Sequence, residues 1–150
     1  MLRFSKKVEY ALIALMDLAD LNVGNPVTAK TVAQHYQLPY ELLGKVMQTL
    51  TRKGLLNSVQ GVKGGYVLGK AADKISIKEV IEILEGPISI TSCGPHADDH
   101  TECDLFSTCT IKSPMEVIQL ELDKYFSNIS LKDLKASYYK TGSEPIQLSV

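Results

Sequence analysis

All three cysteines of this 150-residue chain, Cys93, Cys103 and Cys109, lie within one segment, residues 87–112. The segment shows no helical or strand periodicity, so we do not expect its thiols to serve as small hydrophobic core residues. An odd number of cysteines also excludes a framework of paired disulfides. Thiolates gathered in a loop are soft ligands that hold zinc or iron–sulfur clusters. The sequence therefore predicts a metal centre, with inert cysteines or a facultative disulfide as the alternative.

A metal centre of either kind needs a fourth ligand. His96 and His100 lie in the same segment, and the Cys93-x2-His96 spacing could close a zinc tetrahedron. Both histidines stand beside Asp98 and Asp99, so solvated loop residues are the alternative interpretation. Spacing alone does not separate zinc from an iron–sulfur cluster.

The charge of the chain is divided unevenly between its two halves. The net charge is −1, but residues 1–70 carry nine Lys and Arg against four acids, whereas residues 71–150 carry seven against thirteen. This asymmetry indicates that the first half faces a polyanion, unless the surface charges have segregated by chance.

Hydrophobic periodicity organises that basic half into three helices and a hairpin. We expect helices over residues 5–21, 28–36 and 39–52, the second capped by Thr28 and the third begun by Pro39. The third helix is expected to bury Leu43, Val46, Met47 and Leu50. Short strands over 55–59 and 66–68 then flank a glycine-rich tip. Helix, helix, helix and hairpin is the order of a winged helix-turn-helix, in which the third helix enters the major groove. The wing is expected to bring Lys63 and the bare backbone N–H groups of Gly61, Gly64 and Gly65 to phosphates. The candidate DNA-binding residues on these two elements are Tyr40, Glu41, Lys45, Gln48, Gln60, Gly61, Lys63, Gly64 and Gly65.

The second half of the chain is predicted to form helices on both sides of the cysteine segment. Ser76 starts a capping box for a helix that Gly86 ends, and Ser113 starts another, with Pro114 at the first helical position. The helix after Ser113 is long and apolar on one side, which predicts packing between two subunits, or alternatively on the first helix of the same chain. Its stripe comprises Met115, Ile118, Leu122, Tyr125, Phe126 and Ile129, and Ser130 caps a last short helix. The expected organisation is a DNA-binding domain over 1–86, a cluster-binding loop over 87–112, dimerisation and C-terminal helices over 113–140 and a flexible tail over 141–150.

Several functional classes are excluded or disfavoured by the same residues. No run of about 18 apolar residues or cleavable leader is present, so we expect a cytoplasmic protein. No nucleophile triad, phosphate loop or carboxylate pair supports an enzyme. A winged module that binds only proteins is disfavoured by Lys45, Arg52 and Lys63 on the expected outer surfaces.

Three stretches together resemble the Rrf family of bacterial winged-helix regulators, whose members include the IscR-like and NsrR-like proteins. They are KKVEYALIALMDLA near the N-terminus, LTRKGLLNSVQGVKGGYVLGK at residues 50–70, and three cysteines before a long helix. The resemblance spans about residues 1–135. It implies a homodimer whose three cysteines and one further residue hold an iron–sulfur cluster.

The resemblance also bears on the fourth ligand. The histidine that serves in the iron–sulfur-biogenesis branch matches Lys112 here, which cannot bind iron. In the nitric oxide branch the ligand is an acid of the first helix from the other subunit, and Glu9 matches that position. A surface acid favourable to the helix dipole is the alternative for Glu9. The nine residues between Cys93 and Cys103 exceed the usual family spacing, which keeps His96 and His100 as rival ligands.

Taken together, the sequence predicts a mainly α fold with a small β-hairpin wing, a winged helix-turn-helix followed by a long dimerisation helix. We expect a homodimeric repressor that binds a pseudo-palindromic double-stranded operator. Its affinity would be switched by an iron–sulfur cluster that senses redox state, nitric oxide or iron–sulfur status. A 2Fe–2S cluster is preferred to 4Fe–4S because a carboxylate ligand and a loose loop suit the smaller cluster. A zinc- or thiol-based redox regulator with the same DNA-binding half is the alternative.

Overall fold

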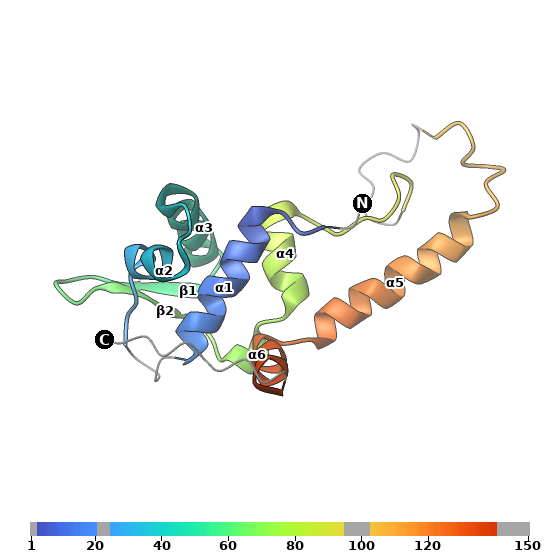
Figure 1. Ribbon diagram of the computed structural model, residues 1–150. Coiled ribbons are helices and arrows are strands. Elements are labelled where there is room, and N and C mark those ends of the chain that lie inside the picture. Colours follow the sequence, from blue (N-terminus) through green and yellow to red (C-terminus); the bar gives the residue numbers. More distant parts are fainter. Residues whose placement is uncertain (1–2, 21–24, 95–102, 141–150) are drawn as a thin grey trace.

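The computed structural model describes residues 3–20, 25–94 and 103–140, and its first three helices form the expected helical unit. These are α1 (Lys6–Asp20), α2 (Ala29–Tyr36) and α3 (Tyr40–Arg52), seen in blue to teal in Figure 1. The Thr28 hydroxyl accepts a hydrogen bond from the Thr31 backbone N–H at 3.0 Å, which confirms the predicted cap of α2. Gln37 then ends α2 in the left-handed conformation (φ 53°), so that α3 can turn across it.

A two-stranded antiparallel hairpin follows α3 and projects from the helices (Figure 1). Strand β1 (Leu56–Val59) pairs with β2 (Gly65–Leu68) in the register Leu56 to Leu68 and Val59 to Gly65. The base of the hairpin is fixed to the segment before α2, because Val27 and Tyr66 exchange backbone hydrogen bonds of 2.9 and 2.8 Å. The hairpin is therefore held as a wing beside the α2–α3 pair.

After the hairpin the chain continues through a 3₁₀ turn, η1 (Ala72–Lys74), into α4 (Ile77–Glu85), which packs on α1 and α3. The Ser76 hydroxyl accepts from the Glu79 backbone N–H at 3.1 Å, which confirms the predicted cap of α4. Helix α6 (Leu131–Lys140) closes this side, with the Leu131 side chain fully buried. Two backbone hydrogen bonds, from Leu131 to Ile75 and from Ile77 to Ile129, join the starts of the two helices.

The long helix α5 (Lys112–Asn128) extends away from the rest of the molecule, in orange in Figure 1. Its predicted capping box is wrong. The helix begins at Lys112 with Ile111 in the cap position, and no side chain caps it. Ser113 and Pro114 are already helical, which is possible because the first-turn backbone N–H groups have no partner in the helix and proline lacks one.

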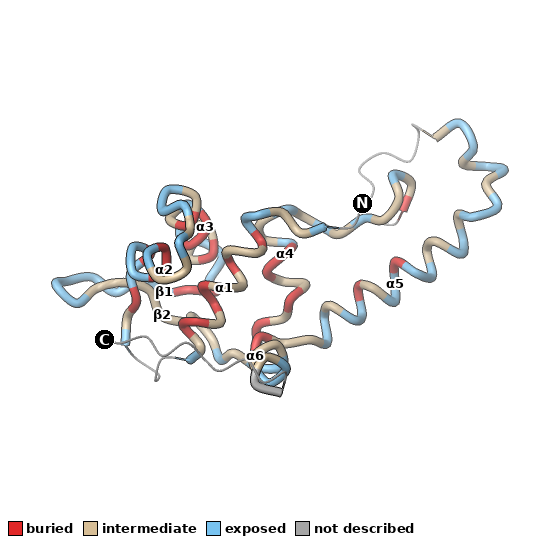
Figure 2. Tube along the Cα trace, viewed as in Figure 1, coloured by how far each residue is buried: buried red, intermediate tan, exposed pale blue. Residues whose placement is uncertain are grey.

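Buried residues concentrate in the winged-helix unit and are sparse along α5 (Figure 2). The core is apolar, and the largest of its fully buried side chains include Leu15, Leu43, Met47, Leu50 and Leu56. By contrast, the two buried residues of α5, Gln119 and Asp123, are polar. In the described part of the chain, no helix is long and apolar enough to cross a membrane.

Candidate DNA interface and cysteine segment

Helix α3 separates its residues cleanly into a core face and an outward face. Leu43, Val46, Met47 and Leu50 are buried, as the periodicity predicted. The candidate base-contacting residues are all exposed, and Tyr40 retains 58% of its surface. Among the described residues, Lys45 forms no ion pair, so its charge is available to an external anion. The outward residues of α3 are Tyr40, Glu41, Lys45, Gln48 and Arg52.

The tip of the wing presents Gln60, Gly61 and Lys63 to solvent. Lys63 forms no ion pair within the described ranges, which fits the predicted phosphate contact. The predicted free backbone N–H is wrong for Gly64, because its N–H already donates to the Gly61 carbonyl oxygen at 3.0 Å. The turn at the tip therefore uses one of the three expected donors itself.

Gly64 and Gly65 also have reasons to be glycine that lie inside the fold. A Cβ on Gly64 would lie 2.5 Å from the Val59 carbonyl oxygen. A Cβ on Gly65 would lie 2.7 Å from the Val27 carbonyl, and Gly65 has a φ of +156°. The Gly65 contact depends on Val27, which is distant in the sequence, so sequence patterns could not distinguish this structural use of Gly65 from phosphate binding.

A buried polar contact joins α1 to α2. The Tyr36 hydroxyl donates to Asp17 Oδ1 at 3.1 Å, and Asp17 is only 5% exposed. Burial raises the pKa of Asp17, and this is opposed by the Tyr36 hydrogen bond and by His35 nearby. Burial beside the Asp17 carboxylate raises the pKa of Tyr36 above its usual range, which keeps the phenol protonated as the donor. The contact ties the orientation of α2 to α1.

The cysteine segment lies at the far end of α5 from the wing (Figure 1). Cys93, Cys103 and Cys109 are free thiols, and each is half-buried. The described residues bring no three His, Cys, Asp or Glu side chains into one metal-binding group. His96 and His100 lie outside the described residues, so the structure does not test them as ligands. The three cysteines predicted as cluster ligands are thus present but do not form an assembled site among the described residues.

Glu9 lies in the first turn of α1 and is engaged by a neighbour. Its carboxylate pairs with the Lys6 ammonium group at 2.5 Å, and its side chain keeps 37% of its exposure. The pairing raises the pKa of Lys6, first through the hydrogen bond to Glu9. Glu9 is therefore an accessible carboxylate that belongs to no ligand group in the described part of a single chain.

Sequence reasoning missed a buried polar clamp between α5 and the start of the cysteine segment. The side chain of Gln119, 1% exposed, donates to the Ile88 carbonyl oxygen at 2.7 Å and accepts from the Ile90 N–H at 2.9 Å. It also donates to Asp123 at 3.2 Å, and Asp123 lies 3.7 Å from the ammonium group of Lys78 on α4. The i, i+4 spacing of Gln119 and Asp123 indicates that the two side chains can interact, but polar residues in an amphipathic helix normally lie on its solvent face, so the spacing did not predict a buried contact.

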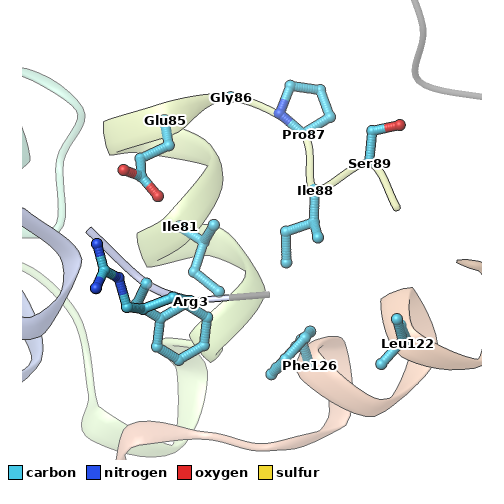
Figure 3. A pocket seen from close by; sticks show the side chains of 10 residues that line it. Arg3, Ile81, Glu85, Gly86, Pro87, Ile88, Ser89, Leu122 and Phe126 are labelled. Carbon is cyan, nitrogen blue, oxygen red and sulfur yellow. The ribbon is translucent and has the colours of Figure 1, made fainter. Parts of the chain in front are cut away.

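An apolar groove separates α4 from the C-terminal half of α5. Figure 3 shows Ile81, Ile88 and Phe126 directed into the space between them, with Arg3 and Glu85 at its edge. Phe4 on the chain before α1 packs against Phe126 with ring centroids 5.9 Å apart and the ring planes tilted by 59°. Further along α5, Ile118 is 48% exposed, so only part of the predicted apolar stripe is covered by the chain itself. Other large apolar residues exposed at or near this helix are Ile111, Val117, Leu120 and Tyr125.

Comparison with known proteins agrees with this geometry. Residues 4–137 match the model of the Rrf2 family, described as iron-dependent transcriptional regulators. The fold is similar to CymR, the global cysteine regulator of B. subtilis, with a TM-score of 0.75 and 28% identity over 91% of this chain and 98% of that one. It is also similar to T. potens IscR, with a TM-score of 0.70 and 25% identity over 99% and 94% of the two chains. Escherichia coli IscR is 27% identical over 133 residues, which is 89% of this chain and 80% of the relative. The chain belongs to the Rrf2 family and is a DNA-binding transcriptional regulator, not an enzyme.

Proposed function

We propose that the protein is a homodimeric repressor whose operator affinity is set by an iron–sulfur cluster. The observation that carries the proposal is the placement of three free, half-buried thiols in the segment between α4 and α5. The iron dependence in the family's description agrees with it. The donor set fits a cluster, since thiolate is the usual cluster ligand.

The ligands would be Cys93, Cys103, Cys109 and, from the other protomer, the partner subunit's Glu9. The described residues of one chain do not bring three such donors together, so the three cysteines would have to gather around the cluster and the partner's carboxylate would complete the set. To bind iron, the accessible carboxylate of Glu9 would have to break its salt bridge with the exposed Lys6. When bound, a 2Fe–2S cluster would supply a centre whose ligation responds to redox state or nitric oxide.

The Gln119 clamp provides a physical link from that segment to the DNA-binding unit. It holds the backbone at Ile88 and Ile90, at the start of the cysteine segment, and reaches α4 through Asp123 and Lys78. Helix α4 packs in turn on α1 and α3. A change at the cysteines would move α5 relative to α4, with a coupling of about 1–3 kcal/mol, a range typical of allosteric proteins.

A dimer is supported by the apolar residues that α5 leaves exposed, of which Ile118 is one example. Large apolar side chains gathered on one helix favour a protein interface. A twofold dimer would present two copies of α3, so the operator is expected to be pseudo-palindromic.

A zinc- or thiol-based redox regulator is the second candidate. It is favoured by the similarity to CymR, which is named for cysteine regulation. In this case Cys93, Cys103 and Cys109 would act through oxidation or zinc binding, with His96 as the fourth zinc ligand. The DNA-binding half would be unchanged.

Anaerobic purification followed by absorbance spectroscopy and metal analysis distinguishes the two candidates. The cluster proposal expects visible sulfur-to-iron absorbance with matching iron and sulfide, and an operator affinity that changes when the cluster is removed. A colourless protein with stoichiometric zinc, or with reversible thiol oxidation that alters DNA binding, would favour the second candidate. Single Cys→Ala changes at the three positions are expected to abolish the absorbance and leave a folded dimer.

The ion pair between Glu9 and Lys6 provides a matched control for testing the role of Glu9. Glu9→Ala and Lys6→Ala both remove the same salt bridge, but only Glu9→Ala removes the carboxylate. The proposal expects a labile cluster and loss of its effect on DNA binding for Glu9→Ala, and a normal cluster for Lys6→Ala. Equal behaviour of the two variants would exclude Glu9 as a ligand. Loss of metal in His96→Ala or His100→Ala would then identify the ligand instead.

A further inference from the structure

Gly44 is a glycine in the middle of α3, the helix that carries the candidate base contacts. It lies one turn from both Glu41 and Gln48, and its neighbour Lys45 is exposed. Its backbone is helical, and its φ is not among the positive values of the chain. Glycine in a helix interior is less favourable than alanine, because glycine gives the unfolded chain more conformational freedom, which is lost on folding. A helix accommodates the alanine Cβ without a steric clash.

The fold gives a reason for the other described glycines but none for Gly44. Gly54, Gly61, Gly65 and Gly86 have positive φ values, which side chains rarely adopt. A Cβ on Gly64 or Gly69 would lie 2.5 or 2.4 Å from backbone oxygen atoms, and one on Gly94 would lie 3.1 Å from the Thr91 hydroxyl. A Cβ on Gly44 would meet nothing within 4 Å. Among the described glycines, Gly44 alone has neither a special backbone conformation nor a close neighbour.

We infer that Gly44 marks the point at which the α3 backbone approaches DNA most closely. With no side chain at this position, a base edge or a thymine methyl group in the major groove can lie against the Cα atom. A Cβ here would hold the helix away from the groove. Glu41, Lys45 and Gln48 would then reach the base edges less well, because hydrogen bonds weaken steeply with distance and misalignment. The inference rests on the DNA-binding role of the family and is independent of the proposed cluster.

The test is Gly44→Ala, examined for both stability and DNA binding. The free protein is expected to melt about 2–4 °C higher, since alanine is the better helix former and nothing obstructs its methyl group. Its affinity for a duplex that the wild-type protein selects from a pool with a randomised centre is expected to fall at least tenfold. Gly44→Leu, with a larger side chain, is expected to bind more weakly still.

Ala136→Gly provides the matched control, since Ala136 is an exposed residue within α6. It exchanges the same two residue types in the opposite direction, so it is expected to lower the melting temperature and leave DNA affinity unchanged. A Gly44→Ala protein that is stabilised and binds the selected duplex as tightly as wild type would overturn the inference. So would a Gly44→Ala protein that is destabilised, because the glycine would then serve the fold. Wild-type DNA binding that does not depend on a cluster would contradict the proposed function. It would not affect the inference about Gly44.

Discussion

At the scale of single residues, the proposed phosphate contact at the wing can be tested separately from the proposed base contacts of α3. Lys63 is exposed at the wing tip and Gln48 is exposed on α3, and the two belong to different elements. A lysine near a phosphate contributes affinity through counterion release and does not read the sequence. A glutamine in the major groove can form two hydrogen bonds with adenine, and this contact discriminates between bases.

We therefore predict that Lys63→Ala weakens binding to all duplexes by a similar factor and reduces the salt dependence by about one phosphate contact. Gln48→Ala is expected to cost roughly 1–3 kcal/mol of discrimination at one base pair. Fluorescence anisotropy over a salt series, with specific and unrelated duplexes, measures both effects. Lys124→Ala on α5 removes an equal charge from an exposed position far from the wing and serves as the control. An unchanged salt slope for Lys63→Ala would exclude the wing from the DNA interface.

A second residue-scale prediction concerns the buried carboxyl of Asp17. Its pKa is raised above the ordinary 3.8, chiefly by burial, so the folded state binds this proton more tightly than the unfolded chain does. Its contribution to stability is therefore fully present below the unfolded pKa and is lost as the pH rises through the folded pKa. Asp17→Asn keeps an oxygen for the Tyr36 hydroxyl and removes the charge.

Relative to wild type, Asp17→Asn is expected to gain stability as the pH rises from about 4 towards neutrality. Urea denaturation at several pH values gives the free energy of unfolding of both proteins. The exposed Asp73→Asn is the control for removal of a surface carboxyl. A difference between wild type and Asp17→Asn that does not vary with pH would show that burial does not shift this group.

At the scale of the elements, local sequence determined most of what was predictable. The caps at Thr28 and Ser76 and the buried face of α3 were predicted because they depend on residues within one or two turns. The start of α5 was mispredicted because Ser113 offers a cap that the helix does not use. The uses of Gly65 and Gln119 could not be predicted, because each depends on backbone that is distant in the sequence, at Val27 and at residues 88–90.

The Gln119 clamp gives the element-scale prediction. Gln119→Glu keeps an acceptor for the Ile90 N–H but loses the donor to the Ile88 carbonyl oxygen and places a second carboxylate beside Asp123. An unsatisfied buried group costs about 1–3 kcal/mol, so the contact between α5 and this segment is expected to open. Hydrogen exchange should show lost protection at Ile90, with the amides of α3 still protected. Glu121→Gln, an exposed exchange on the same helix, is the control. Unaltered protection at Ile90 would show that the clamp does not hold the segment.

At the scale of the whole molecule, the uneven distribution of buried apolar surface explains why two copies of the chain are expected to form a dimer. The winged-helix unit has a complete apolar core from α1 to α4, joined by Leu131 at the start of α6 (Figure 2). Helix α5 touches α4, but Ile118 and its exposed neighbours take no part in either apolar cluster of the described residues. A second copy of α5 would cover these side chains and bring two DNA-binding units into one twofold assembly.

The last prediction tests that assembly. Wild-type protein is expected to sediment as a dimer at micromolar concentration, and Ile118→Asp as a monomer, because a charge in an apolar interface is strongly unfavourable. The variant should remain folded, since Ile118 is 48% exposed in the single chain and lies outside both apolar clusters. Lys124→Ala changes the net charge by the same amount on the same helix and is expected to stay dimeric. The Ile118→Asp monomer would carry a single α3 and occupy one half-site at a time, so its operator affinity should fall although every proposed DNA-contacting residue is intact. A dimeric Ile118→Asp protein would instead show that subunits associate through another surface or that this face of α5 is solvent-exposed.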